Sequence, residues 1–228
     1  MRRKSPHYYT LVASLPWLPR FDRLDRLPIT RERLLKRFRM LNPDDAELVE
    51  RGIEFLAWYR HPVERTDAEM VSAYERLMAV IDDPVVLTVI ELAVDQRMII
   101  VALRRRHRGL PAPTPGEPWG VGRWLHHIER NWDEPDFKLK SEYPWISQAR
   151  AHLEAGETLA LDRLLIELLW DCMDRFLEKD MFSFEALLAY LFKWGLINQW
   201  LSYNREAAKA RFEQLVLEVS GADNNLFD

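Results

Sequence analysis

Two acidic residues in an otherwise apolar run are the strongest candidates for chemistry in this sequence. Glu91 and Asp95 lie one helical turn apart within residues 85–103, where most other residues are apolar. Like charges at this spacing repel each other, and a carboxylate buried without a partner is costly. We therefore expect cationic side chains from other helices to reach these acids. A pocket in which the two acids act as acid and base is the alternative.

A second group of acids forms a stripe on the helix expected at residues 158–179. The spacing i, i+4, i+7 and i+11 places four carboxylates on one face: Glu167, Asp171, Asp174 and Glu178. Paired carboxylates can hold Mg²⁺ or transfer protons. Arg163 and Arg175 are on the same helix. We therefore predict a solvated face with compensated charge.

The remaining reactive residue types form no pattern of a metal or cofactor site. His126 and His127 are adjacent, so on a helix they point about 100° apart and cannot chelate one ion together. The Glu-x-x-His spacing of di-iron bundles does not occur in the sequence. The single cysteine, Cys172, excludes an internal disulfide and a cysteine zinc cluster. We predict no metal, no cofactor and no catalytic residue.

The composition indicates an all-α protein. The 228 residues include 8 Gly against 9 Trp and 10 Phe, with 48% hydrophobic and 30% charged residues. Few glycines allow few tight turns, which favours helices over sheets of many strands. The chain also contains no run of alternating apolar and polar residues long enough to predict a strand.

Helix-capping residues and proline give the expected boundaries. Thr30, Asn42 and Ser183 are typical N-caps, Thr66 with Glu69 forms a capping box, and Pro84 opens the longest apolar helix. That helix is apolar almost all round, which indicates burial on every side, and it ends in four arginines before Gly109. We predict helices over residues 30–40, 43–60, 66–81, 85–108, 119–132, 145–153, 158–179 and 184–205, then an amphipathic helix to 219 and a short one before Pro16.

The proline-rich stretch 111–118 is the clearest break in the chain. It predicts an N-terminal helical half (1–110), a linker (111–118) and a C-terminal helical half (119–228), which can still form one compact domain. We predict that the two halves are similar, because each contains an acidic helix followed by a long apolar helix, at 85–108 in the first half and at 184–205 in the second. Alternatively, the two apolar helices are similar only as core helices, in two halves whose helices are arranged differently.

Charge is distributed unevenly along the chain. Residues 1–40 hold eleven Lys or Arg against three acids, although the whole chain has a net charge of −4. This asymmetry predicts two electrostatically different faces that could orient the protein in a complex. Residues 85–103 and 184–201 contain too many polar residues to span a bilayer, so we expect a cytoplasmic protein.

The basic end of the 85–108 helix is a candidate binding surface. Arg104, Arg105, Arg106 and Arg108 are clustered there, which raises nucleic acid as a possible partner. The sequence pI of about 5.9 and the lack of a recognisable nucleic-acid-binding motif argue against it. We predict no nucleic-acid partner and assign the four arginines to a protein partner.

Three stretches resemble known families. The opening HYYTLVASLPWLPRFDRLDRLPIT (7–30) resembles the start of a bacterial family of uncharacterised proteins associated with V-type ATPase operons. VDQRMIIVALRRRHRGL (94–110) resembles a helix of the C subunit of V/A-type ATPases, whose eukaryotic counterpart is the d subunit. Asp95 matches the acid of that helix and 104–109 its basic end, whereas Met98 stands where the family has Asn. LLAYLFKWGLINQWLSYNREA (187–207) resembles the second such helix, with Tyr190 and Asn198 kept and Gly195 in place of the acid.

This resemblance implies a non-catalytic, all-helical adaptor. In the family it resembles, the adaptor links the soluble rotor shaft to the membrane rotor ring and thereby couples the ATPase to ion or proton transport. The implied partners are shaft and ring subunits, with the membrane reached only through the ring and the protein peripheral to the inner membrane. Candidate partner-binding residues are Asp95, Arg104, Arg105, Arg106, Arg108, Tyr190 and Asn198.

Two alternatives from other classes share these features. A helical scaffold or regulatory protein unrelated to ATPases would have the same composition and capping pattern. A small helical enzyme would use Glu91 and Asp95 in a pocket with a histidine or a metal ion.

Overall fold

The computed structural model describes residues 7–56, 66–79, 81, 83–114, 116–177 and 180–223; at 55, 56, 85, 176, 177 and 204–223 it describes the backbone alone. Throughout these ranges the chain is helical or irregular, without a strand, which confirms the all-α prediction. The elements are α1 (Tyr9–Ser14), the 3₁₀ turn η1 (Phe21–Arg23), α2 (Arg31–Phe38), α3 (Pro43–Leu56), α4 (Asp67–Met78), α5 (Pro84–His107), α6 (Leu125–Arg130), α7 (Ile146–Glu154), α8 (Thr158–Leu177) and α9 (Phe184–Asp223).

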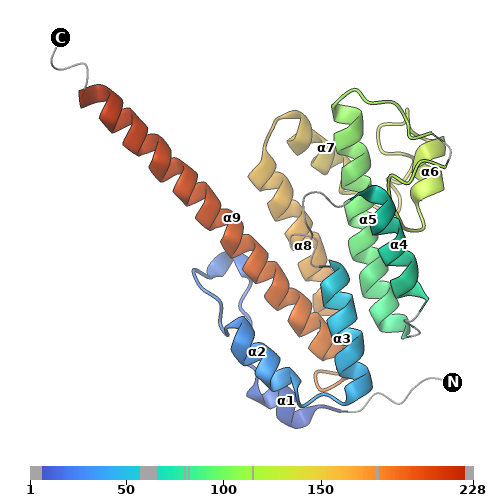
Figure 1. Cartoon of the computed structure of the whole chain (residues 1–228), viewed down its shortest axis with the longest axis vertical. Coiled ribbons are helices and arrows are strands. Elements are labelled where there is room, and N and C mark those ends of the chain that lie inside the picture. Colours follow the sequence, from blue (N-terminus) through green and yellow to red (C-terminus); the bar gives the residue numbers. More distant parts are fainter. Residues whose placement is uncertain are drawn as a thin grey trace.

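Helix α5 is the central element of the fold. Its first half packs with α1–α4 and α9 in one hydrophobic cluster, and its second half packs with α7, α8 and residues 119–139 in another. Ile90, Val94, Ile99 and Leu103, spread over its length, are each at most 2% exposed. The prediction of a long helix with a buried core at 85–108 is therefore confirmed, whereas burial on every side is not, because Thr88 and Arg97 are exposed. Figure 1 shows α5 in green, between α4 and α8.

The predicted N-caps are present. The backbone N–H of Arg33 bonds the Thr30 hydroxyl at 3.4 Å, and that of Asp45 bonds the Asn42 side chain at 2.8 Å. Thr66 and Glu69 form the complete capping box. The Ala186 N–H bonds the Ser183 hydroxyl at 3.1 Å. These caps could be predicted from the sequence because each is formed within four consecutive residues.

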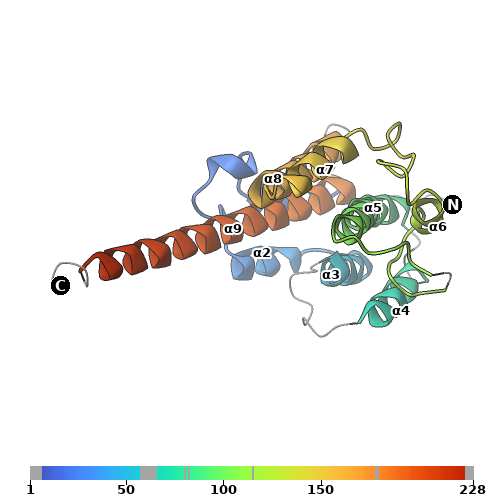
Figure 2. The ribbon, with the colours of Figure 1, turned by 90° about the horizontal axis from the view of Figure 1, so that it is seen from above.

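Two predicted helices, 184–205 and the amphipathic segment to 219, are one continuous helix, α9, of 40 residues. The prediction of a boundary near residue 205 is wrong. No Gly or Pro lies between Leu196 and Ser220, and residues 205–211 are good helix formers, so nothing there stops the helix. Both views show the second half of α9 projecting away from the other helices (Figures 1 and 2).

The predicted helix 119–132 is wrong in its first half, since α6 begins only at Leu125. Gly122 has φ +103°, a value incompatible with an α-helix. A Cβ at this position would lie 2.8 Å from Val94 Cγ1 of α5. Residues 119–124 therefore form an irregular segment that approaches α5 more closely than a helix could.

Side chains from both sides of the proline-rich stretch share the same hydrophobic clusters. The first cluster joins Val86, Ile90 and Met98 to Val121, Leu187 and Leu191, and the second joins Ile100 and Leu103 to Ile146 and Leu161. A third cluster places Phe21 of η1 against Trp170 of α8 and Trp200 of α9.

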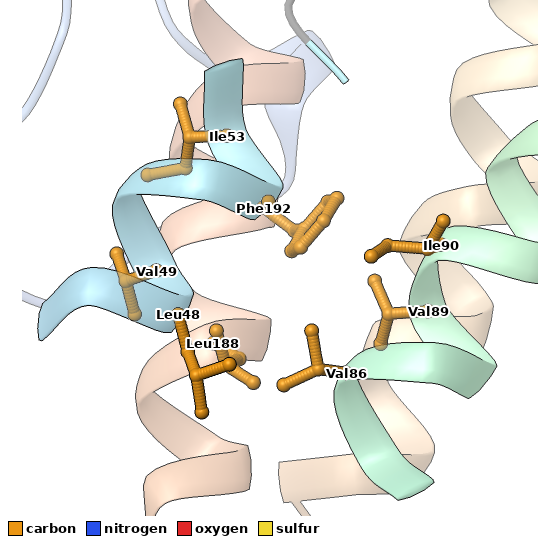
Figure 3. Close-up of a pocket in the computed structure, with 9 residues that line it drawn as sticks. Leu48, Val49, Ile53, Val86, Val89, Ile90, Leu188 and Phe192 are labelled. Atoms are coloured by element: carbon orange, nitrogen blue, oxygen red, sulfur yellow. The ribbon is translucent and has the colours of Figure 1, made fainter. Parts of the chain in front are cut away.

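Helices α3, α5 and α9 leave an apolar cavity between them. It is small and is lined by Leu48, Val49, Gly52, Ile53, Val86, Val89, Ile90, Leu188 and Phe192. Figure 3 shows the labelled side chains of the three helices directed toward this common space. A Cβ built on Gly52 would meet no atom within 4 Å.

We predict that Gly52→Ala stabilises the fold. The methyl group would enter open space in the cavity, and alanine in a helix interior is more favourable than glycine by about 0.5–1 kcal/mol. The measurement is the free energy of unfolding from urea denaturation of wild type and variant.

Gly122→Ala serves as the counterpart with the same chemical change. It should destabilise by more than about 1 kcal/mol, because the backbone conformation and the contact with Val94 both disfavour a side chain. Equal effects of the two substitutions would contradict this account.

Candidate functional site

Arg123 binds both acids of the apolar helix. Its guanidinium Nε lies 2.9 Å and Nη2 2.8 Å from Oδ2 of Asp95, and Nη1 lies 3.3 Å from Oε2 of Glu91. The Asp95 side chain is 2% exposed, whereas the Arg123 side chain is 50% exposed. The prediction that a cation from elsewhere in the chain reaches these acids is confirmed, but the prediction that it comes from another helix is wrong, because Arg123 lies in the irregular segment before α6.

Tyr143 completes the surroundings of the Asp95 carboxylate. Its hydroxyl donates to Asp95 Oδ2 at 2.7 Å and accepts from the Trp124 indole N–H at 3.0 Å. The rings of Trp124 and Tyr143 meet edge to face, 6.1 Å apart. One buried carboxylate oxygen thus joins α5, the segment before α6 and the segment before α7.

Burial dominates the protonation behaviour of this cluster. Desolvation raises the pKa of Asp95 above its usual value, although the Tyr143 hydrogen bond and the charge of Arg123 oppose this effect. Desolvation, together with the hydrogen bond to Asp95, also raises the pKa of Tyr143. The neutral hydroxyl of Tyr143 therefore donates to the carboxylate, as the distances require.

The backbone of residues 120–122 positions Arg123. The Val121 N–H points at Sδ of Met98 at 3.3 Å, and a Cβ on Gly120 would lie 2.6 Å from the same sulfur. Glycine at 120 and 122 therefore allows the segment to lie directly on α5, so that the next residue reaches Asp95. The sequence alone did not identify Arg123 or Tyr143, although Gly-x-Gly before an arginine was a usable signal.

The arrangement is suited to holding segments together. A catalytic dyad would need room for a substrate beside the carboxylates, but Arg123 occupies the position between them. In the described ranges, no three His, Cys, Asp or Glu side chains come together to hold a metal ion. We therefore describe these residues as the Asp95 clamp: Glu91, Asp95, Arg123, Trp124 and Tyr143.

Two of the four clustered arginines bind loops of the same chain. Arg105 pairs with Glu117 at 2.7 Å and donates to the Pro111 carbonyl at 3.2 Å, so it holds both ends of the proline-rich stretch. Arg106 donates to three carbonyls, those of Trp132, Glu134 and Pro135, and its guanidinium lies 4.5 Å from the Phe137 ring centroid.

The other candidate partner-binding residues are dispersed. Arg104 and Arg108 are exposed near the end of α5, and Asn198 is half-buried on α9. Tyr190 donates its hydroxyl to the Pro16 carbonyl at 2.9 Å, which ties the N-terminal segment to α9. The structure does not bring Tyr190 or Asn198 together with the arginines, which are on α5.

The acidic stripe on α8 has partners beyond its own helix. Glu167 binds Arg163 of α8, as predicted, and also Arg20 near η1. Asp174 instead pairs with Lys193, a buried residue of α9 whose ammonium lies 4.1 Å from the Trp170 ring centroid. Asp171 is exposed, and Glu178 lies outside the described residues.

Comparison with known proteins gives one partial match. Residues 123–221, less than half of the chain, match a family model described as "Protein of unknown function (DUF2764)". No curated protein and no solved structure matches the chain. The matched region begins at Arg123 and includes Trp124 and Tyr143, but it leaves out the helix that carries Asp95.

None of the helices in the described part of the chain combines the length and apolar character that crossing a membrane requires.

We predict that Arg123→Met destabilises the protein by about 2 kcal/mol at neutral pH. The substitution leaves a buried carboxylate with Tyr143 as its main donor, although half-exposure of Arg123 moderates the loss. The double variant Asp95→Asn/Arg123→Met should lose less stability than Arg123→Met, because the unpaired charge is removed. The free energies of unfolding of wild type, both variants and Asp95→Asn, measured by urea denaturation, form a double-mutant cycle that gives the interaction energy between the two residues.

Arg108→Met is the matched control, since Arg108 is exposed at the end of α5. It should change stability by less than about 0.5 kcal/mol. Strict additivity of the Asp95 and Arg123 substitutions would show that the clamp has no energetic role.

We also predict that the stability lost in Asp95→Asn grows as the pH falls. The pKa of Asp95 is higher in the folded protein than in the unfolded chain, so between these two values the folded state binds more protons. Wild type therefore gains stability as the pH falls through this window, and the asparagine variant does not. Unfolding free energies of both proteins from neutral pH to about pH 4 test this. A difference that shrinks toward low pH would contradict it.

Proposed function

We propose that this protein is a non-catalytic adaptor in the central stalk of a V/A-type rotary ATPase, where it couples the soluble rotor shaft to the membrane rotor ring for ion transport. The observation that carries the proposal is the position of the two stretches that resemble the C subunit of these ATPases. Residues 94–110 belong mainly to α5 and residues 187–207 to α9, and these two helices pack against each other in the core.

An adaptor that transmits torque needs stiffness, and the polar contacts support this requirement. The Asp95 clamp, Arg105 and Arg106 tie irregular segments to α5, while Tyr190 and Trp194 bind the carbonyls of Pro16 and Ile29 to α9. These polar contacts therefore hold irregular segments of the chain against the two long helices. Dense packing of large side chains adds to the stiffness.

The distribution of charge supports two distinct docking faces. Exposed cations gather on α2, and exposed acids gather on α3 and α4: Glu47, Glu50, Glu54, Asp67 and Glu75. Faces of opposite charge would set which end of the adaptor meets the shaft and which meets the ring. Arg104 and Arg108, exposed at the end of α5, are a further candidate contact with the shaft.

The proposal predicts that loss of the protein separates ATP hydrolysis from ion transport. In membranes from cells that lack it, the soluble catalytic part should still hydrolyse ATP, but ion uptake into vesicles should be lost. Addition of the purified protein should restore uptake. Both activities are measured on the same membranes, and co-purification with shaft and ring subunits is measured in parallel.

A protein that binds neither shaft nor ring subunits, and whose loss leaves ion uptake unchanged, would refute the proposal. A helical scaffold or regulator unrelated to ATPases would give this result. The third possibility, an enzyme that uses Glu91 and Asp95, predicts that Asp95→Asn abolishes an activity while the free energy of unfolding changes little.

A further inference from the structure

Positive charge and exposed apolar side chains coincide in the N-terminal part of the molecule. Within the described part of the chain, seven large apolar side chains are exposed, and four of them lie in the first 40 residues: Tyr9, Trp17, Leu35 and Met40. A fifth, Met181, adjoins Phe182, whose ring lies 4.8 Å from that of Tyr9. Residues 7–40 of this part hold eight of the 32 Lys and Arg.

Helix α2 shows this combination most clearly. Leu34 and Phe38 are buried, so the helix packs through one side. The acid Glu32 is exposed on this helix. Arg31, Leu35 and Arg39 are exposed at i, i+4 and i+8 along α2 and its C-terminal end, and Lys36 and Met40 are exposed next to them. Leu35 is 46% and Met40 44% exposed. We call these five residues the α2 surface.

The α2 surface is available for a partner. Within the described ranges, the side chains of Arg31, Lys36 and Arg39 form no ion pair. Helices α1 and α2 pack together and lie away from α6 and α7 (Figure 1). On α3 and α4 the exposed acids outnumber the exposed arginines Arg51 and Arg76.

We propose that the α2 surface binds the surface of a bilayer that contains anionic phospholipids. Each Lys or Arg near such a surface contributes about 1 kcal/mol, and Leu35 and Met40 can enter the headgroup region. The acidic α3 and α4 are repelled by the same lipids, which orients the molecule. This direct contact goes beyond the indirect membrane attachment of the proposed function and does not depend on it.

The distribution of apolar side chains favours lipid over a protein partner. A stable protein interface has a contiguous apolar centre surrounded by a polar rim. On α2, Leu35 is flanked by arginines one turn before and one turn after it, so no such centre forms. Fluid lipids can adjust to apolar side chains that are separated by cations, whereas a rigid partner surface cannot.

The test is co-sedimentation of the full chain with phosphatidylcholine vesicles and with vesicles of mixed phosphatidylcholine and phosphatidylglycerol. We expect binding to the mixed vesicles alone, weakened by high salt because screening shortens the range of the attraction. Arg31→Gln/Arg39→Gln should lower the partition coefficient by roughly 30-fold, or about fivefold per arginine. Arg104→Gln/Arg108→Gln, which changes two exposed arginines at the C-terminal end of α5, should lower it less than about twofold.

Leu35→Ser tests the apolar contribution and should weaken binding by roughly tenfold. Its control is Leu159→Ser on α8, because Leu159 is 48% exposed, close to the 46% of Leu35. Circular dichroism and the unfolding midpoint verify that each variant is folded.

Three results would overturn the proposal: no binding to mixed vesicles, equal binding to both kinds of vesicle, or undiminished binding of the Arg31→Gln/Arg39→Gln protein. Absence of vesicle binding would leave the α2 surface to an acidic protein partner.

Discussion

The burial of the Asp95 carboxylate is the constraint on which the surrounding structure depends. An acid that is 2% exposed in the middle of a central helix must receive strong donors, because an unpaired charge there would be very costly. Arg123 and Tyr143 supply them, and neither is on α5. Arg123 reaches the acid because residues 119–124 lie against α5, which the glycines at 120 and 122 allow. One charge therefore determines the course of the chain between α5 and α7.

The same principle organises the other irregular segments. Backbone carbonyls outside helices need donors, and the long helices provide them through side chains. Arg106 of α5 binds three carbonyls of residues 132–135, and Trp194 and Tyr190 of α9 bind those of Ile29 and Pro16. Large side chains with a polar end therefore connect loops to helices.

This construction agrees with a mechanical role. Two long helices pack against each other, and polar contacts from several directions hold the other segments onto them. Opposite charges gather on different helices, α2 and α3–α4, so the molecule can be oriented by its surroundings. The proposed adaptor function and the proposed lipid contact use these properties in different ways: the first requires the rigid core, and the second requires the exposed face of one short helix.

The sequence by itself determined the helical class, the burial of α5, the capped starts of α2, α3, α4 and α9, and the need of Asp95 for a cation. These features depend on composition, periodicity or four-residue patterns, which operate without knowledge of the rest of the chain. Only the tertiary structure decided that the cation is Arg123, that Tyr143 is the second donor and that Lys193 is the partner of Asp174. The partners of Asp95 are 28 and 48 residues away, and many other arginines and tyrosines were equally suitable by type. Helix packing brings one particular pair within hydrogen-bonding distance, and no local pattern encodes that choice.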